Sequence, residues 1–173
     1  MSIDIARLVR VTIADAVIQR VVRETIRYTQ RQDHEHRDVS IAFIGPKRMR
    51  ELNRTYHGED RTTDVLAFGQ PQAVGRNTQP PHAPSPGGKG GNKKIFLPLT
   101  VGGGARGGGD LGEIVLCPAY VRQQAKRAGE PFRRELTRVL VHGTLHLLGH
   151  DHATPRDAER MFALQEHIVQ KFR

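Results

Sequence analysis

The sequence has little of what secreted, disulfide-linked or membrane-spanning proteins require. Its 173 residues include a single cysteine, Cys117, so the chain cannot form an intramolecular disulfide or a cluster of thiolates around a metal. Charged residues interrupt the apolar ones between Ile3 and Leu8, and the unbroken hydrophobic run of a secretory signal or membrane span is therefore missing there. These absences predict a cytoplasmic protein in a reducing compartment, with no membrane partner.

Positive charge and chain length are the next constraints. The formal net charge is +9, and an excess of Lys and Arg favours polyanionic partners because it releases the counterions condensed on phosphates. An ordinary basic surface exposed to solvent would give the same composition. A chain of 173 residues is long enough for a real hydrophobic core, so we expect residues 1–173 to form a single domain.

The segment 70–109 differs in composition from the rest of the chain. It is rich in proline and glycine, as at 80–81 and 107–109, and it carries basic residues but no acidic ones. Such a mixture buries too little apolar area to offset the entropy lost on ordering, which predicts a long flexible insertion. The apolar stretch 95–99 could add an edge strand, although Pro98 limits it. No phosphate-binding motif surrounds these glycines.

Hydrophobic periodicity in the remaining sequence predicts both strands and helices. Apolar runs indicate strands, and helical spacing bounded by Pro, Gly or Thr indicates helices. The expected strands are 3–8, 39–44, 64–68 and 111–117, and the expected helices are 13–26, one from Pro46, 118–128, one from Pro131 through His146, and one from Pro155 after the cap Thr154. In the last helix, Phe162 is expected in the core. The order predicts an α+β fold, with helices packed on a small mixed sheet.

The helix that begins at Pro131 carries the most informative residues. It is apolar on nearly every side, which predicts that it is buried. His142 and His146 are four residues apart and therefore share one face. Gly149 allows the backbone to reverse, which can bring His152 back toward them. Three neutral imidazoles leave the fourth position of a divalent ion open, so the spacing predicts one catalytic zinc ion bound by His142, His146 and His152.

Other interpretations of these residues compete with the catalytic zinc site. The pattern matches the HExxHxxGxxH signature of metalloproteases, except that Gly143 replaces their general-base glutamate. A peptidase would therefore lack its base. The same histidines could close a purely structural metal site, and His150 could compete as a ligand. Asp151 could orient an imidazole or cap the turn after Gly149.

Four blocks of the chain, in order, carry a resemblance to a known family. They are LNRTY at 52–56, TDVLAF at 63–68, LGEIV at 111–115 and HGTLHLLGHDH at 142–152. Together they resemble the YbeY family of endoribonucleases, also called rRNA maturation factors. In the third block the family more often has Asp where this chain has Glu113. The resemblance covers most of the chain except the N-terminal helix and the segment 70–109.

This resemblance implies a zinc-dependent endoribonuclease specific for single strands, with the three histidines as ligands. The family acts in the 3′-end maturation of 16S rRNA and in ribosome quality control, which implies rRNA and the ribosomal small subunit as partners. After the tyrosine the family usually has an arginine, thought to serve RNA handling or catalysis, where this chain has His57. Arg54 and Arg61 are nearby substitutes, so RNA binding is expected at Arg54, His57 and Arg61. Aromatic residues make up 5% of the chain, which predicts little base stacking.

The chemistry of cleavage has more than one possible course. The nucleophile could be a water activated by the metal or a ribose 2′-hydroxyl. Glu113 is a candidate protein base, or else a packing residue at the end of its strand. Two other functions fit the same residues: a metal-dependent hydrolase of another substrate, such as a peptide, and a ribosome-associated binding protein whose zinc only stabilises the fold.

Overall fold

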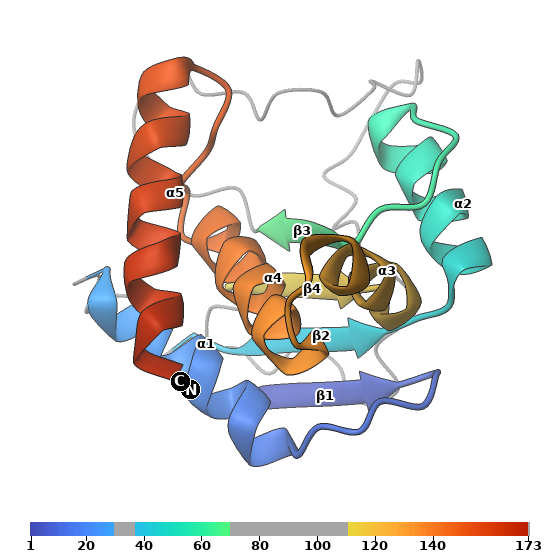
Figure 1. Cartoon of the computed structure of the whole chain (residues 1–173), viewed down its shortest axis with the longest axis horizontal. Coiled ribbons are helices and arrows are strands. Elements are labelled where there is room, and N and C mark those ends of the chain that lie inside the picture. Colours follow the sequence, from blue (N-terminus) through green and yellow to red (C-terminus); the bar gives the residue numbers. More distant parts are fainter. Residues whose placement is uncertain (30–36, 70–110, 173) are drawn as a thin grey trace, which may run out of the picture.

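The computed structural model describes residues 1–29, 37–69 and 111–172, with a four-stranded sheet at their centre (Figure 1). The strands are β1 (Ile3–Arg7), β2 (Val39–Phe43), β3 (Val65–Gly69) and β4 (Gly112–Leu116). Their order is β1-β2-β4-β3, with β1, β2 and β4 parallel and β3 antiparallel to β4. The predicted flexible insertion at 70–109, with its possible edge strand at 95–99, lies outside the described residues.

Five α-helices and a short 3-10 helix accompany the sheet in this part of the chain. They are α1 (Asp15–Tyr28), α2 (Pro46–His57), α3 (Pro118–Ala128), α4 (Phe132–Leu147), α5 (Pro155–Val169) and η2 (Gln170–Phe172). Thr154 caps α5 as expected, since its Oγ1 accepts a hydrogen bond from Asp157 N at 3.2 Å. Gly129 ends α3 with a φ of 67°. The predicted α+β fold with a small mixed sheet is confirmed.

Alternate residues of the strands pack into two separate hydrophobic clusters. Ile41 and Phe43 of β2 belong to a large cluster that includes buried residues of α1, α4 and α5. Ala42, between them, belongs to a smaller cluster with Met49 and Leu52 of α2. Successive side chains of a strand point to opposite faces of the sheet. Therefore α1, α4 and α5 cover one face, and α2 packs against the other.

Helix α4 lies in the middle of the covered face (Figure 1) and contacts α1, α3, α5, β3 and β4. Leu136, Leu140 and Leu145 are entirely buried, and the prediction of a buried helix carrying the histidines is confirmed. Although much of α4 is buried, neither it nor any other helix of the described residues combines the length and apolar content needed to cross a membrane. Packing on all sides holds α4 rigidly, and rigid placement is what a set of metal ligands needs.

Candidate metal centre

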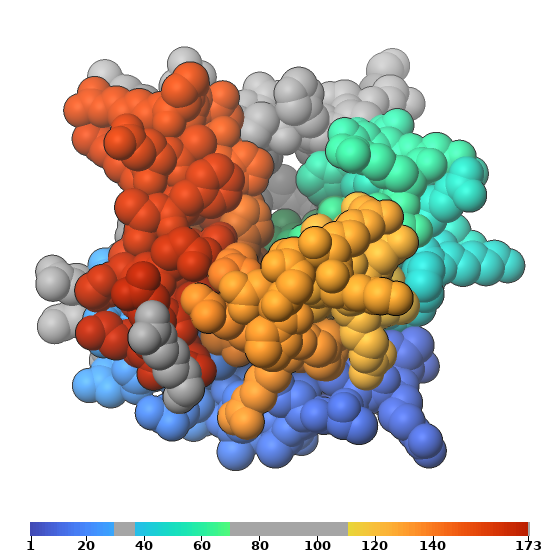
Figure 2. Space-filling view, viewed as in Figure 1, coloured from blue at the N-terminus to red at the C-terminus, as the bar shows by residue number. Residues whose placement is uncertain are grey.

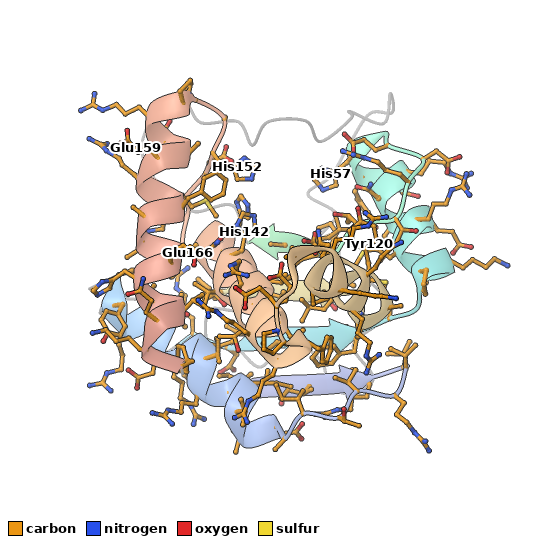
Figure 3. All side chains as sticks on the ribbon, in the orientation of Figure 1. His57, Tyr120, His142, His152, Glu159 and Glu166 are labelled. Atoms are coloured by element: carbon orange, nitrogen blue, oxygen red, sulfur yellow. The ribbon has the colours of Figure 1, made fainter. Side chains whose placement is uncertain are left out.

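Three histidines come together at the C-terminal end of α4, and Figure 3 labels two of them, His142 on α4 and His152 on the loop that follows. His142 and His146 lie one turn apart, and their Nε2 atoms are 3.1 Å from each other. The helix ends at Leu147, and Gly149 takes a left-handed conformation with a φ of 83°. The loop that follows returns His152 to the helix, so that one ligand atom from each histidine lies within 4.8 Å of the other two.

The spacing and chemistry of these nitrogens fit a zinc ion. Bonds of about 2.0–2.1 Å place two nitrogens of a zinc tetrahedron about 3.3 Å apart, close to the 3.1 Å between the Nε2 atoms of His142 and His146. His152 is the exposed member of the group, so packing constrains its ring less than the rings of His142 and His146. Three imidazoles without a thiolate are the donor set of a catalytic zinc site rather than a structural one.

Burial keeps the two helix histidines neutral. Burial, with smaller contributions from the charges of His142 and His152, lowers the pKa of His146 to about 4. Burial also lowers the pKa of His142, against the opposing effects of a hydrogen bond to Gln165 and the charge of Asp64. A neutral imidazole is the form that offers a lone pair to a metal. His142 and His146 therefore need not lose a proton to bind one at neutral pH.

Gln165 of α5 is a partner of this site that the sequence did not indicate. Its Oε1 lies 2.9 Å from Nδ1 of His142, and the residue is 7% exposed. Its Nε2 donates to Oε1 of Glu166 at 3.1 Å, and that oxygen accepts a hydrogen bond from Nε of Arg138 at 2.8 Å. Asp151, the orienting group expected from the sequence, is adjacent to His152 in the chain. A glutamine 23 residues away from His142 carries no spacing signal.

The other two polar candidates of the loop, Asp151 and His150, have distinct positions. Oδ1 of Asp151 accepts a hydrogen bond from the backbone N of His152 at 2.8 Å, which is the turn-capping role considered for it. Its charge also opposes, in part, the lowering of the pKa of His146. The backbone N of His150 donates to the carbonyl of Leu145 at 3.0 Å, so His150 helps to close the end of the helix. The three-histidine group consists of the other residues, His142, His146 and His152.

Phe162 of α5 places an aromatic ring against the histidines. It stacks on His152 with ring centroids 5.8 Å apart and an interplanar angle of 19°, and on His142 at 6.3 Å and 14°. The residue is 45% exposed, so the expectation that it belongs to the core is wrong. Helical spacing put Phe162 among the apolar residues of α5, but at this point the helix faces the histidine loop. An exposed aromatic face beside a site can stack on a nucleic-acid base.

Glu113 points away from the metal centre. The next residue along β4, Ile114, faces α4, where its Cγ2 is the nearest atom to the Cβ position of Gly143. Because neighbouring strand residues point to opposite faces, the side chain of Glu113 lies on the other side of the sheet from the histidines. Burial there raises its pKa to about 7. This position favours the packing role of Glu113 over the role of a protein base.

The three residues expected to bind RNA lie near the end of α2. Arg54 and His57 are in its last turn, and Arg61 follows in the loop; all three are exposed. Nε of Arg61 donates to Oε2 of Glu59 at 2.7 Å, so part of its charge is already neutralised. In the view of Figure 3, His57 lies on the α2 side of β3 and His152 on the α5 side. Figure 2 shows the surface hollowed between α5 and α2.

The fold and the site together define a class: an α+β protein in which a buried helix and the loop after it present three histidines at one point. Residues 6–173 match the family model described as Endoribonuclease YbeY. This chain belongs to that family. The resemblance carried by the four sequence blocks is thereby confirmed.

Individual relatives agree with this assignment. Endoribonuclease YbeY of Halalkalibacterium halodurans is 31% identical over 157 residues, which cover 90% of this chain and 84% of the relative. The protein of the same name from Staphylococcus aureus is 28% identical over 153 residues, 87% of this chain and 84% of the relative. That from Frankia casuarinae is 34% identical over 132 residues, 76% of this chain but 55% of the longer relative. The solution structure of TM1509 from Thermotoga maritima shares the fold, with a TM-score of 0.52 and 23% identity over 97% of this chain and 87% of that one.

Proposed function

We propose that this protein is a zinc-dependent endoribonuclease specific for single strands, acting in the 3′-end maturation of 16S rRNA and in ribosome quality control. The observation that carries the proposal is the convergence of His142, His146 and His152, whose ligand atoms lie within 4.8 Å of one another, in a member of the Endoribonuclease YbeY family. One zinc ion is the proposed cofactor, and the ribosomal small subunit is the proposed partner. Residues 1–173 act as one cytoplasmic domain, with 70–109 as an insertion.

The three histidines bind the ion from two different elements, the helix α4 and the loop that follows it. His142 and His146 are fixed by the packing of α4 and are neutral because they are buried. His152 belongs to the exposed loop and completes the set from the solvent side. When bound, a zinc ion supplies a Lewis acid that lowers the pKa of water and polarises a phosphoryl oxygen. Three protein ligands leave space in the coordination sphere for the substrate or water.

Residues on both sides of the hollow between α5 and α2 hold the RNA strand. On the α2 side, Arg54, His57 and Arg61 are exposed and contact the phosphate backbone, with Arg61 weakened by its pairing with Glu59. On the α5 side, Phe162 stacks on a base beside the histidines. A base in a duplex is already stacked on both sides, so an exposed aromatic ring selects an unpaired one. This arrangement accounts for a preference for single strands.

The proposal is tested by cleavage of a 16S rRNA precursor with the purified full chain. We expect cleavage to stop when a chelator removes the metal and to return when zinc is added. His152→Ala should remain folded but inactive, whereas His167→Ala, which changes an exposed histidine on α5, should cleave normally. Cleavage at an unchanged rate by protein shown to contain no metal would overturn the proposal.

The same assay separates the two competing functions. A protein whose zinc is only structural should lose thermal stability when His152 is replaced, and should bind the small subunit without cutting RNA. A hydrolase of another class should leave the precursor intact and cleave a peptide in a metal-dependent way. Either result would replace the endoribonuclease assignment.

A further inference from the structure

We propose that Gln165 is a positioning residue that fixes the tautomer of His142, so that Nδ1 carries the proton and Nε2 presents its lone pair to the other two histidines. We further infer that Arg138, acting through Glu166, sets the direction of the Gln165 amide. The inference deepens the proposed function, on which it rests for the identity of the metal. The tautomer itself is a property of the metal-free protein.

The two ring nitrogens of His142 have different neighbours. Nδ1 lies 2.9 Å from Oε1 of Gln165, and Nε2 lies 3.1 Å from Nε2 of His146. A neutral imidazole carries one proton, on one of its two nitrogens. Only the tautomer with the proton on Nδ1 leaves Nε2 free to bind a metal at the point where the histidines meet.

The direction of the Gln165 amide decides which tautomer is favoured. If Oε1 faces Nδ1 of His142, the ring must donate, because a carbonyl oxygen only accepts. If the amide were turned around, its NH2 group would face the ring and favour the wrong tautomer. The oxygen and nitrogen of an amide are distinguished by their hydrogen-bond partners. The partner of the amide atom that faces away from His142 therefore determines which end of the Gln165 amide faces the ring.

That group is the carboxylate of Glu166. Nε of Arg138 donates to Oε1 of Glu166 at 2.8 Å, and the ion pair holds the pKa of Glu166 below its usual value. An ionised carboxylate only accepts hydrogen bonds, so it requires the NH2 end of Gln165, which donates to it at 3.1 Å. Arg138 is held in turn by Glu135. The chain of partners thus points the Gln165 carbonyl at His142.

Burial makes the arrangement specific. Gln165 is 7% exposed, so water cannot readily replace a lost partner, and turning the amide would set two acceptors against each other at Glu166. Gln165 belongs to α5 and His142 to α4. Packing of α5 on α4 is therefore required for the ligand geometry, although α5 contributes no ligand. Groups that orient a ligating imidazole in this way typically change metal affinity about 10- to 100-fold when removed.

The experiment uses the metal-free full chain and its zinc complex. Nitrogen-15 NMR of the histidine side chains reports the tautomer of His142, and competition with a chromophoric chelator reports the dissociation constant for zinc. We expect the wild type to have the proton on Nδ1. Gln165→Leu should allow both tautomers and weaken zinc binding about 10- to 100-fold. Gln123→Leu, at an exposed position on α3, should change neither property.

Two further variants keep the test decisive if Gln165→Leu folds poorly. Gln165→Glu keeps an acceptor opposite Nδ1 and should retain the tautomer, and Glu166→Leu frees the amide to turn and should shift the tautomer in the same direction as Gln165→Leu. A wild-type protein with the proton on Nε2, or zinc affinity and tautomer unchanged in a folded Gln165→Leu, would overturn the inference. Neither measurement involves RNA, so a failure of the endoribonuclease assignment would be recognised separately.

Discussion

The Cβ position of Gly143 lies 3.0 Å from Cγ2 of Ile114 and 3.1 Å from Cγ2 of Val65. A glycine here lets α4 pack directly against β3 and β4. The sheet therefore fixes its distance from the helix that carries His142 and His146. The metalloprotease signature has its general-base glutamate at the same position. A glutamate at 143 would collide with the sheet unless α4 moved, which argues against a peptidase on physical as well as sequence grounds.

Replacing Gly143 with alanine should therefore destabilise the protein. Overpacking costs about 1–3 kcal/mol, and the higher helix propensity of alanine returns about 1 kcal/mol, which leaves a net loss of about 1 kcal/mol in the free energy of unfolding. Urea denaturation measures it. In an Ile114→Ala background the obstructing methyl is absent, and the loss should shrink. If Gly143→Ala instead stabilises the protein, the close approach of helix and sheet is contradicted.

The raised pKa of Glu113, about 7, predicts a stability that falls as the pH rises. Between the unfolded value near 4.5 and about 7, the folded protein binds more protons at Glu113 than the unfolded chain does, so folding is disfavoured as the carboxyl ionises. Glu113→Gln removes this dependence. We therefore compare the free energy of unfolding of this variant with that of wild type. With allowance for solvent screening, we expect the difference to shift in favour of the variant by about 1–2 kcal/mol between pH 4.5 and pH 8.

Denaturation of both proteins at the two pH values measures this difference, with metal removed so that zinc binding does not contribute. Glu24→Gln provides the control, because that carboxylate lies on the surface beside Arg27. An equal gain in both variants would show that net charge, and not burial of Glu113, causes the effect.

Phe162 should contribute to RNA binding more than to catalysis. Stacking of a base on an aromatic ring is worth about 1–3 kcal/mol, so Phe162→Ala should raise KM for a single-stranded substrate about tenfold with little change in kcat. Phe162→Trp should retain binding. Leu8→Ala removes another exposed apolar side chain, 52% exposed, and should leave KM unchanged. A loss confined to kcat would place Phe162 in the support of the histidines instead.

Freeing Arg61 from Glu59 should strengthen RNA binding. Nε of Arg61 lies 2.7 Å from Oε2 of Glu59, and both side chains are exposed to solvent. Glu59→Gln therefore releases the guanidinium for a phosphate at little cost in stability. We expect tighter binding and a salt dependence steeper by about 0.7–0.9 in log–log slope. Glu24→Gln removes the same charge at a different surface position. If both variants bind RNA equally well, Arg61 makes no specific contact.

Much of the fold was predictable because its signals are local. Pro46, Pro118, Gly129 and Thr154 mark helix ends through their own backbone and side-chain preferences, and each has the expected place in the structure. The meeting of His142 and His146 also follows from helix geometry alone. The return of His152 needed one further element, the left-handed turn at Gly149, which the sequence also indicated.

What the sequence did not indicate depends on contacts between distant elements. The hydrogen bond between Gln165 and His142 requires the packing of α5 on α4, and no rule of sequence spacing specifies that packing. Phe162 has the helical spacing of a core residue, yet it is 45% exposed because it faces the histidine loop. The orientation of Glu113 follows only when it is known which face of β4 α4 covers.

In the proposed function, one metal ion held by His142, His146 and His152 is required for RNA cleavage. A titration of metal-free protein with zinc, followed by single-turnover cleavage of a single-stranded rRNA fragment, tests it most directly. We expect the rate to rise in proportion to zinc and to level off at one equivalent per chain, and we expect no such rise with His142→Ala. Cleavage before zinc is added, or a rate that does not follow the bound ion, would contradict it.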